Sequence, residues 1–287
     1  MSKISKLGMG IIAFEGIEHI KNITYELRNL VDTIVICLQK ESYHGEPIQQ
    51  SDVDDANKLL EYGYVDDIIW FEAIDKHLEE GNAGPRWIEA DKRNFILDYL
   101  ENTAKCSHAL VIDSDEFYDK DDFKYAKNLI DNDPDAKISY CQYVNYYRDY
   151  MHVLVWPFLA YVPFISEVSY RFHFKNGNFT LPSDPTRRYV AGPGDTPKVL
   201  DFTVIKMHHL SWIRLDITKK LHNWSAKKYF QNNELEEAIL DRYYNYVEGQ
   251  NAIITFNVPN YHVCVNRLPK QYIHPHFMLD ENITPLK

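Results

Sequence analysis

Three acidic side chains follow an apolar run in the stretch ALVIDSDEF, residues 109–117. Asp113, Asp115 and Glu116 lie where that run ends, and carboxylates this close repel one another unless a cation or a proton neutralises them. Two aspartates spaced two apart suit Mg²⁺ or Mn²⁺, which also takes oxygens from a substrate diphosphate. The pattern indicates a divalent-metal site, although Asp113 could instead cap a following helix.

Two adjacent histidines lie in a second apolar stretch, FTVIKMHHLSW, residues 202–212. Adjacent side chains on a strand face opposite ways, so one of His208 and His209 would enter the site while the other packs or hydrogen-bonds. Trp212, close behind them, could form a platform for a sugar ring or fill the core. The stretch therefore offers one candidate histidine ligand.

The elements that must position these residues alternate along the first part of the chain. Apolar runs predict strands at 9–14, 33–38, 66–72 and 108–113. Helical spacing predicts helices at 17–30, 52–63 and 85–104. This alternation indicates an α/β fold with a mostly parallel central sheet flanked by helices.

Ligands of such open sheets bind beyond the carboxyl ends of the strands. This rule predicts one crevice bordered by Phe14–Glu15, Gln39–Lys40 and Asp113–Asp115.

The later part of the chain reads differently. Strands are predicted at 136–150, 167–174 and 202–212, and helices near 216–230 and 233–248. No clean linker divides the chain, so we expect a catalytic domain over 1–215 and a helical extension over 216–287 packed on it. The apolar segment 151–168 is interrupted by two prolines and is expected to be buried or to line a cleft, not to span a membrane. A flap that touches a membrane is the alternative.

Composition limits the possible partners and the compartment. The 287 residues carry a formal net charge of −11, which argues against stable duplex DNA binding, because that binding depends on Lys and Arg displacing counterions. The four cysteines are scattered without a Cys-X-X-Cys pair, so neither a disulfide framework nor a zinc site is indicated. A reducing compartment fits this usage, and we expect a cytoplasmic protein.

The segment KRNFILDYLENTAKCSHALVIDSDEF, residues 92–117, resembles the central part of nucleotide-sugar glycosyltransferases of the GT-A fold, especially family 2. In those enzymes a helix with an Arg-Asn pair, here Arg93 and Asn94, precedes a strand that ends in a DXD motif, here Asp113-Ser114-Asp115. HLSW, residues 209–212, is similar to the His-X-Ser-Trp stretch of GT-A enzymes resembling family 17. The resemblance implies a Rossmann-like GT-A fold.

The resemblance also implies roles for individual residues. Ala13, Phe14 and Glu15 would border the nucleobase and ribose, and Gln39 would lie near the base. Family 2 usually has an Asp-Gly-Ser-type turn near Gln39, where this chain reads LQKES. Arg93 would contact the diphosphate or brace the DXD loop.

The metal site follows from the same resemblance. Asp113 would touch ribose or metal, Ser114 would belong to the nucleotide-binding loop, and Asp115 would bind the metal. The His-X-Ser-Trp alignment selects His209 as the histidine that completes the site. The implied cofactor is Mn²⁺ or Mg²⁺.

The expected activity is transfer of a sugar from a nucleoside-diphosphate sugar, a UDP-sugar foremost, to an acceptor hydroxyl on a glycan, lipid, protein or modified nucleobase. The metal would neutralise the departing diphosphate, with help from Arg93, Lys198 or Arg214. An inverting enzyme also needs a carboxylate base. Asp195 in AGPGDTP is the first candidate and Glu167 the second; a retaining enzyme would need neither.

A loop over residues 183–197 is rich in Pro and Gly and could order over a bound donor, with Arg187 and Arg188 on phosphate. It could equally be a plain surface loop.

Two other classes of protein remain open at this stage. The first is a nucleotidyl- or phosphoryl-transferring enzyme that uses the same carboxylates. The second is a non-catalytic carbohydrate-binding protein with a GT-A-like fold. No Walker-type glycine loop is present, which disfavours an ATPase.

Overall fold

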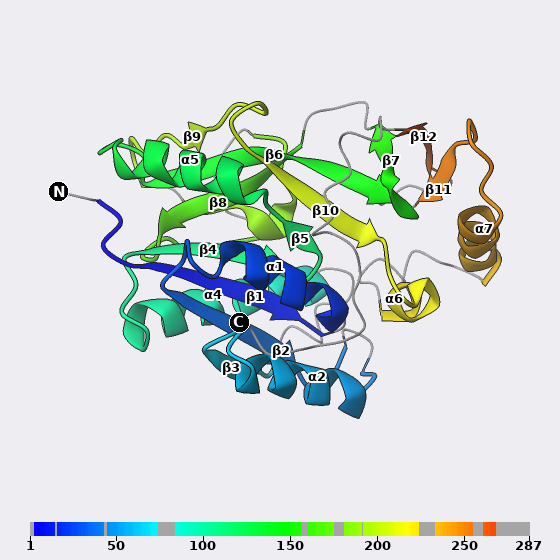
Figure 1. The fold of residues 1–287 in the computed structure, drawn as a ribbon, viewed down its shortest axis with the longest axis horizontal. Helices are drawn as coiled ribbons and strands as arrows, with labels where there is room; N and C mark the ends of the chain where they lie inside the picture. Colours follow the sequence, from blue (N-terminus) through cyan, green and yellow to red (C-terminus); the bar gives the residue numbers. More distant parts are fainter. Residues whose placement is uncertain are drawn as a thin grey trace.

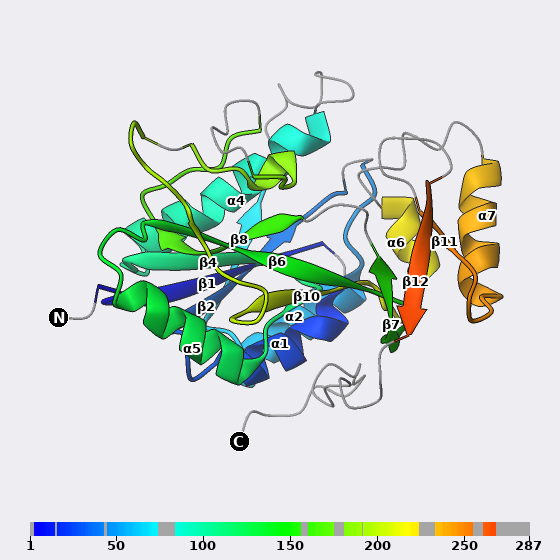
Figure 2. The same ribbon diagram turned by 90° about the horizontal axis from the view of Figure 1, so that it is seen from above.

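The computed structural model describes residues 3–14, 16–42, 45–73, 84–155, 160–174, 181–190, 192–223, 233–254 and 261–267. These residues form an α/β fold around a 12-stranded mixed sheet (Figure 1). Figure 2 shows helix α4 on one face of the sheet and α1, α2 and α5 on the other. The predicted α/β class with helices flanking a central sheet is confirmed.

The parallel half of the sheet holds the four predicted strands in the spatial order β3-β2-β1-β4. Their bounds are β1 Leu7–Ala13, β2 Thr33–Gln39, β3 Asp67–Phe71 and β4 His108–Asp113. Every residue of β1 is buried, as expected for a strand that has helices over both faces. The helices that connect these strands are α1 Ile20–Leu27, α2 Gln50–Glu61 and α4 Gly84–Asn102.

Helix α4 packs closely on β1 because β1 carries glycines where the helix crosses it. A Cβ at Gly10 would lie 2.0 Å from Cγ2 of Ile96, and one at Gly8 would lie 2.6 Å from a Leu100 methyl carbon. Close packing fixes α4, and with it Arg93, against the end of the neighbouring strand β4.

The other half of the sheet is largely antiparallel, so the description "mostly parallel" holds only for β1 to β4. Strand β8 is antiparallel to both β4 and β6, and β10 runs parallel to β6 but antiparallel to the short β5. The bounds are β5 Glu116–Phe117, β6 Ile138–Tyr147, β7 Asp149–Val155, β8 Tyr161–Glu167, β9 Lys198–Val199 and β10 Lys206–Trp212.

Two details of this half differ from the sequence prediction. The strand expected at 167–174 lies earlier, as β8, and helix α5, Lys120–Asp131, was not among the predicted helices. Asp119 caps α5 by accepting hydrogen bonds from the backbone N–H groups of Asp121 and Asp122. The described parts of the apolar segment 151–168 are strand residues of β7 and β8, with Ala160 ahead of β8 and Val168 after it. No helix in the described ranges combines the length and apolarity needed to cross a membrane.

The region after residue 215 is not purely helical, which corrects the predicted helical extension. Helices α6 Ile217–Asn223 and α7 Asn233–Tyr244 are followed by strands β11 Ala252–Ile254 and β12 Tyr261–Arg267. Strand β12 pairs antiparallel with β7 and so continues the main sheet. A separate apolar cluster joins this region to the end of β10 through Tyr147, Leu154, Trp212, Ile217, Leu221, Ile239, Tyr243 and Ala252.

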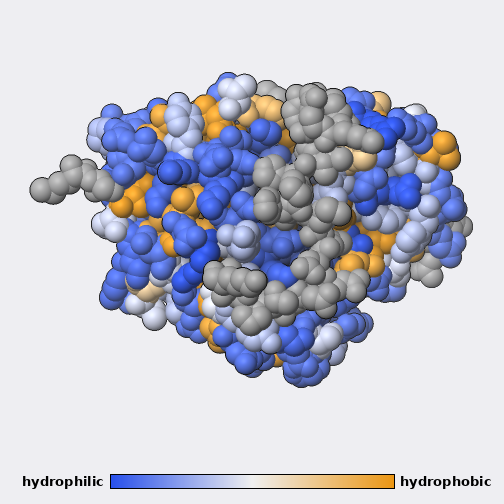
Figure 3. Space-filling view, viewed as in Figure 1, coloured by the Kyte–Doolittle hydropathy of each residue, from blue (hydrophilic) through white to orange (hydrophobic). Residues whose placement is uncertain are grey.

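The remaining buried apolar side chains form one core on each face of the sheet. The larger core lies against α1, α2 and α5, and the second lies between the sheet and α4. The face drawn in Figure 3 is mostly hydrophilic, with apolar residues in small separate groups.

Candidate functional site

The site begins where β4 ends. The register of β1 with β4 places Ile12 opposite Asp113, and the backbone N–H of Ser114 donates to the carbonyl of Ile12 at 3.0 Å. Phe14 and Gln39, at the ends of β1 and β2, line the same cavity as Asp113. The crevice expected at the carboxyl ends of the parallel strands is present in the structure.

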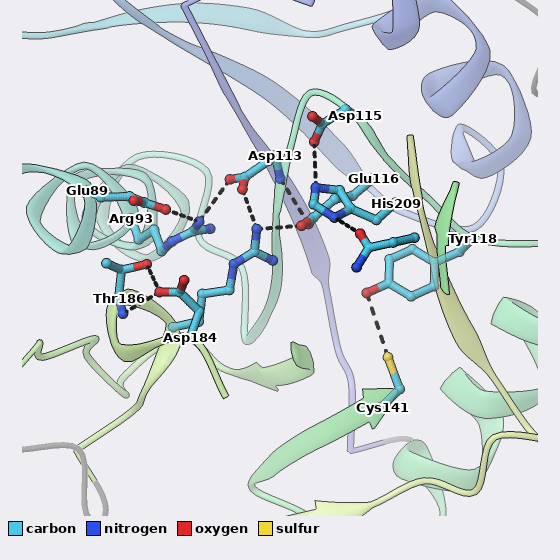
Figure 4. Close-up of polar contacts among 12 residues, drawn as sticks. Glu89, Arg93, Asp113, Asp115, Glu116, Tyr118, Cys141, Asp184, Thr186 and His209 are labelled. Carbon is cyan, nitrogen blue, oxygen red and sulfur yellow. Dashed lines mark hydrogen bonds and ion pairs between the residues drawn. The ribbon is translucent and has the colours of Figure 1, made fainter. Parts of the chain in front are cut away.

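A turn at Ser114 leads into β5, which pairs with β10. In this pairing Glu116 lies opposite His209. Among the described residues, one group has the composition of a metal site: ligand atoms of Asp115, Glu116 and His209 all lie within 4.8 Å of one another (Figure 4). The antiparallel β5–β10 contact therefore joins two segments that are far apart in the sequence.

His209 is oriented by a residue on the neighbouring strand. Its Nδ1 lies 2.5 Å from Oδ1 of Asn145 on β6, and its Nε2 lies 3.4 Å from Oδ1 of Asp115. In metal-binding histidines, the ring nitrogen that does not bind the metal is characteristically held by a hydrogen bond of this kind. His208 faces the other way and its Nδ1 lies 2.8 Å from the hydroxyl of Tyr146, so His209 is the histidine in the site.

The donor set fits a divalent cation. Carboxylate oxygens suit Mg²⁺ and Mn²⁺, and an imidazole nitrogen favours a transition metal. Asp115, Glu116 and His209 would hold Mn²⁺ better than Mg²⁺ on this ground. Asp113, which was predicted as a ligand together with Asp115, is not part of this group.

Asp113 forms ion pairs with two arginines. Arg93 on α4 donates from Nη2 to its Oδ1 at 2.9 Å, and Arg187 binds its Oδ2. Burial alone would raise the pKa of Asp113, but Arg187 and Arg93 hold that pKa below its ordinary value. Arg187 also forms an ion pair with Glu116, whose pKa is nevertheless raised by burial.

Asp115 forms ion pairs with a different arginine and with a lysine. Nη2 of Arg214 lies 2.5 Å from its Oδ2, and Nζ of Lys220 on α6 lies 3.6 Å from the same oxygen. Burial would raise the pKa of Asp115, but Arg214, His209 and Lys220 hold it well below the usual value. Arg214 and Asp115 are both nearly inaccessible, with side chains 5% and 7% exposed.

A glycine makes room for Arg214. Gly16 has φ 80°, and a Cβ there would lie 1.8 Å from Nη1 of Arg214 and 2.8 Å from Oγ of Ser114. Both the backbone conformation and the close approach favour glycine at this position.

These side chains surround a cavity of about 300 Å³. Six of the nine residues predicted to bind the nucleotide or the metal line it: Phe14, Gln39, Asp113, Ser114, Asp115 and His209. Arg93 and Ala13 do not line the cavity: Arg93 is buried and contacts Asp113, and Ala13 is buried in β1. Glu15 falls outside the described residues.

The two proposed catalytic bases lie elsewhere. Asp195 is held by Lys137 at 3.1 Å and by the hydroxyl of Tyr170 at 2.7 Å. Lys137 immediately precedes β6, whose residue Asn145 reaches His209, and eight residues of strand span about 26 Å. Glu167 pairs in register with His108, at the amino end of β4. Both acids thus lie at the opposite edge of the sheet, and neither lines the cavity.

Of the basic residues predicted to contact the diphosphate, some line the cavity and others lie away from it. Arg214 and Arg187 are at the cavity, whereas Lys198 forms a 2.7 Å contact with Asp133, near the start of β6. Arg187 ends a short 3₁₀ helix, Pro185–Arg187, and Arg188 turns away to the carbonyl of Ser183 at 3.1 Å. Ala191 of the loop 183–197 is outside the described residues.

Several cavity residues were missed by the sequence reasoning. They are Ser42, Glu89, Lys92, Asn145, Asp184 and Lys220. Glu89, Lys92 and Arg93 had a usable signal, because spacings of three and four place them on one side of a helix. Lys92 is 2% exposed, and burial lowers its pKa. Trp212 lines the cavity but is also packed against Tyr147, with ring centres 6.0 Å apart.

Comparison with protein-family models gives no match to this chain, and comparison with curated proteins gives none either.

Proposed function

We propose that this chain is a metal-dependent glycosyltransferase that moves a sugar from a nucleoside-diphosphate sugar, a UDP-sugar foremost, to an acceptor hydroxyl. One observation carries the proposal. Asp115, Glu116 and His209 come together at the carboxyl edge of the parallel strands, inside a cavity that is also lined by Arg187, Arg214 and Lys220. A cation site combined with three basic side chains suits a ligand that carries a diphosphate.

The chemistry divides among the residues of the cavity. A bound Mn²⁺ would act as a Lewis acid and stabilise the charge that develops on the leaving diphosphate. Arg214 and Lys220 add fixed positive charge beside it. Because these side chains are already held by Asp115, little reorganisation is needed when the bond to the sugar breaks.

The nucleoside would lie against the ends of β1 and β2. Phe14 offers an apolar surface, and Gln39 offers an amide that can hydrogen-bond to a base edge. Tyr143 on β6 and Tyr161 on β8 also line the cavity and are suited to the acceptor, because an aromatic ring with a hydroxyl packs well against a sugar.

An inverting reaction requires a carboxylate inside the cavity, and Asp195 and Glu167 are therefore not retained. Glu89 and Asp184 line the cavity without belonging to the metal group. Oδ1 of Asp184 accepts from both N and Oγ1 of Thr186, which commits that oxygen to capping the 3₁₀ helix. Burial raises the pKa of Glu89, although Arg93 opposes this, and a raised pKa suits a group that takes up a proton. We therefore favour Glu89 as the base.

The test is a screen of UDP-, GDP-, CDP- and dTDP-sugars with the full chain and Mn²⁺, with and without simple glycan acceptors. We expect release of a nucleoside diphosphate from at least one donor, and loss of that release in EDTA. Release of nucleoside monophosphate or pyrophosphate would instead indicate nucleotidyl transfer.

The matched controls are two aspartate variants. Asp115→Asn should abolish turnover and Asp195→Asn should keep it. Binding of a donor without metal-dependent turnover would favour a carbohydrate-binding protein and contradict the proposal.

A further inference from the structure

The charged side chains of the cavity balance one another. The carboxylates that line it are Glu89, Asp113, Asp115, Glu116 and Asp184, and the basic residues that line it are Lys92, Arg187, Arg214 and Lys220. Arg93 does not line the cavity, but it donates hydrogen bonds to both Glu89 and Asp113. Five negative and five positive side chains leave no surplus of negative charge to attract a free divalent cation.

Glu116, one of the candidate metal ligands, already has partners for both oxygens. Its Oε2 accepts from the backbone N–H of Asp113 at 3.1 Å, and its Oε1 forms an ion pair with Arg187. The side chains of Glu116 and Arg187 are only 2% and 10% exposed, so water screens this pair weakly. A divalent cation on Oε1 would lie beside the guanidinium, and like charges would repel.

We propose that the divalent cation and a diphosphate bind this cavity cooperatively, and that Arg187 couples them by exchanging Glu116 for the diphosphate. The choice of a diphosphate rests on the proposed function. The anion brings at least two negative charges, which offset the charge of the cation and give Arg187 a new partner. The cation then gains access to Glu116.

Coupling of this kind is reciprocal, so the cation and the anion each strengthen the binding of the other by the same factor. A free cation must compete with Arg187, whereas a cation that arrives with the anion does not. Removing the positive charge of Arg187 should therefore strengthen the binding of the cation alone and weaken the coupling.

The experiment is calorimetric titration of the full chain with Mn²⁺, in the absence and presence of pyrophosphate, corrected for the Mn²⁺–pyrophosphate complex measured in buffer. Wild-type protein should bind Mn²⁺ at least tenfold more tightly with pyrophosphate. Arg187→Gln should bind Mn²⁺ alone at least fivefold more tightly than wild type, with coupling below threefold. Equal affinity of the wild type with and without pyrophosphate would overturn the inference.

Two further variants guard against a trivial result. Arg188→Gln makes the same change of charge one residue along, where the side chain contacts the carbonyl of Ser183 and no cavity carboxylate, and it should behave as wild type. Arg187→Lys keeps the charge and should keep weak binding of Mn²⁺ alone. If Arg187→Gln fails to fold, strong binding of Mn²⁺ alone by Arg187→Lys would still contradict the proposed competition.

These measurements are independent of catalysis. Coupling without turnover of any nucleotide sugar would reject the glycosyltransferase function and leave this inference standing. Turnover without coupling would reject only the inference.

Discussion

The two ends of strand β4 carry similar residue types in different surroundings. At the carboxyl end, Asp115 and Arg214 form an ion pair whose side chains are 7% and 5% exposed. Near the amino end, Lys3 lies 3.7 Å from Glu167, and the two side chains are 18% and 31% exposed. Lys137, the partner of Asp195, is 50% exposed.

This difference in burial has a physical consequence. Charges in contact with water interact weakly with each other, and removing one partner matters little. Buried charges have lost their hydration and depend on their partners, so the loss of one leaves an uncompensated charge. The carboxyl end therefore holds buried charges that depend on one another, whereas the ion pairs near the amino end are partly open to water.

The largest expected effect distinguishes the two ends directly. Asp115→Asn should lower the free energy of unfolding by about 3 kcal/mol, because Arg214 and Lys220 lose a buried partner. It should also weaken Mn²⁺ binding in the presence of pyrophosphate by about 100-fold, because a ligand is lost. Urea denaturation and calorimetry measure the two effects. Unchanged stability would contradict the claim that the pair is buried and interdependent.

A second prediction concerns acid, where both ends should respond alike. Burial lowers the pKa of His19, whose Nε2 lies 2.8 Å from the carbonyl of Ile213, and of His108, at the amino end of β4, from 6.5 to about 4. The unfolded chain then binds protons that the folded chain does not. The free energy of unfolding should therefore fall as the pH drops from about 6.5 to 4, by up to about 1.4 kcal/mol per pH unit for each histidine.

Urea denaturation at several pH values tests this prediction. His19→Gln and His108→Gln should each flatten the slope. Variants that keep the wild-type slope would show that the two histidines are protonated in the folded state as readily as in the unfolded state.

A third prediction compares two glycines with the same backbone angle. Gly16 and Gly63 both have φ 80°, but an added Cβ meets Arg214 only at Gly16 and meets nothing within 4 Å at Gly63. Alanine at either position should cost about 1 to 2 kcal/mol of stability through the left-handed backbone. Only Gly16→Ala should also displace Arg214 and weaken pyrophosphate binding severalfold, as measured by calorimetry. Equal pyrophosphate affinity in the two variants would show that Arg214 does not contact the anion.

The smallest effects are expected at the amino end. Asp195→Asn and Glu167→Gln should each change the free energy of unfolding by less than about 1 kcal/mol, because Lys137 is half exposed and the contact of Glu167 with Lys3 is long and open to water. Neither should change the rate of donor turnover. A loss of turnover in Asp195→Asn with normal stability would support Asp195 as the base. It would contradict the inference that Asp195 lies too far from the cavity to take part in the reaction.

The parallel half of the fold was predictable because it depends on local signals. Each of its strands is a short apolar run, and the helices between them show regular apolar spacing. The position of Asp113 at a strand end followed from the same pattern. The rule for carboxyl ends of strands then gave the location of the cavity.

The remainder depended on contacts between distant segments. Arg187, at the end of a 3₁₀ helix, pairs with Glu116, and Arg214, just after β10, pairs with Asp115. No periodic pattern in the sequence encodes these pairings. Asp195 looked suitable because it lies in a Pro- and Gly-rich loop, but such loops occur at both edges of a sheet. Asn145 gave no signal at all, because its role depends on the register between β6 and β10.

The addition of β12 to β7 gives the C-terminal part of the chain a protective role. Residues 264–267 cover backbone N–H and C=O groups of β7 that would otherwise form an open strand edge. Uncovered edges of this kind recruit strands from other molecules. A chain shortened before β12 would therefore be prone to self-association. It would still contain all three candidate metal ligands, Asp115, Glu116 and His209.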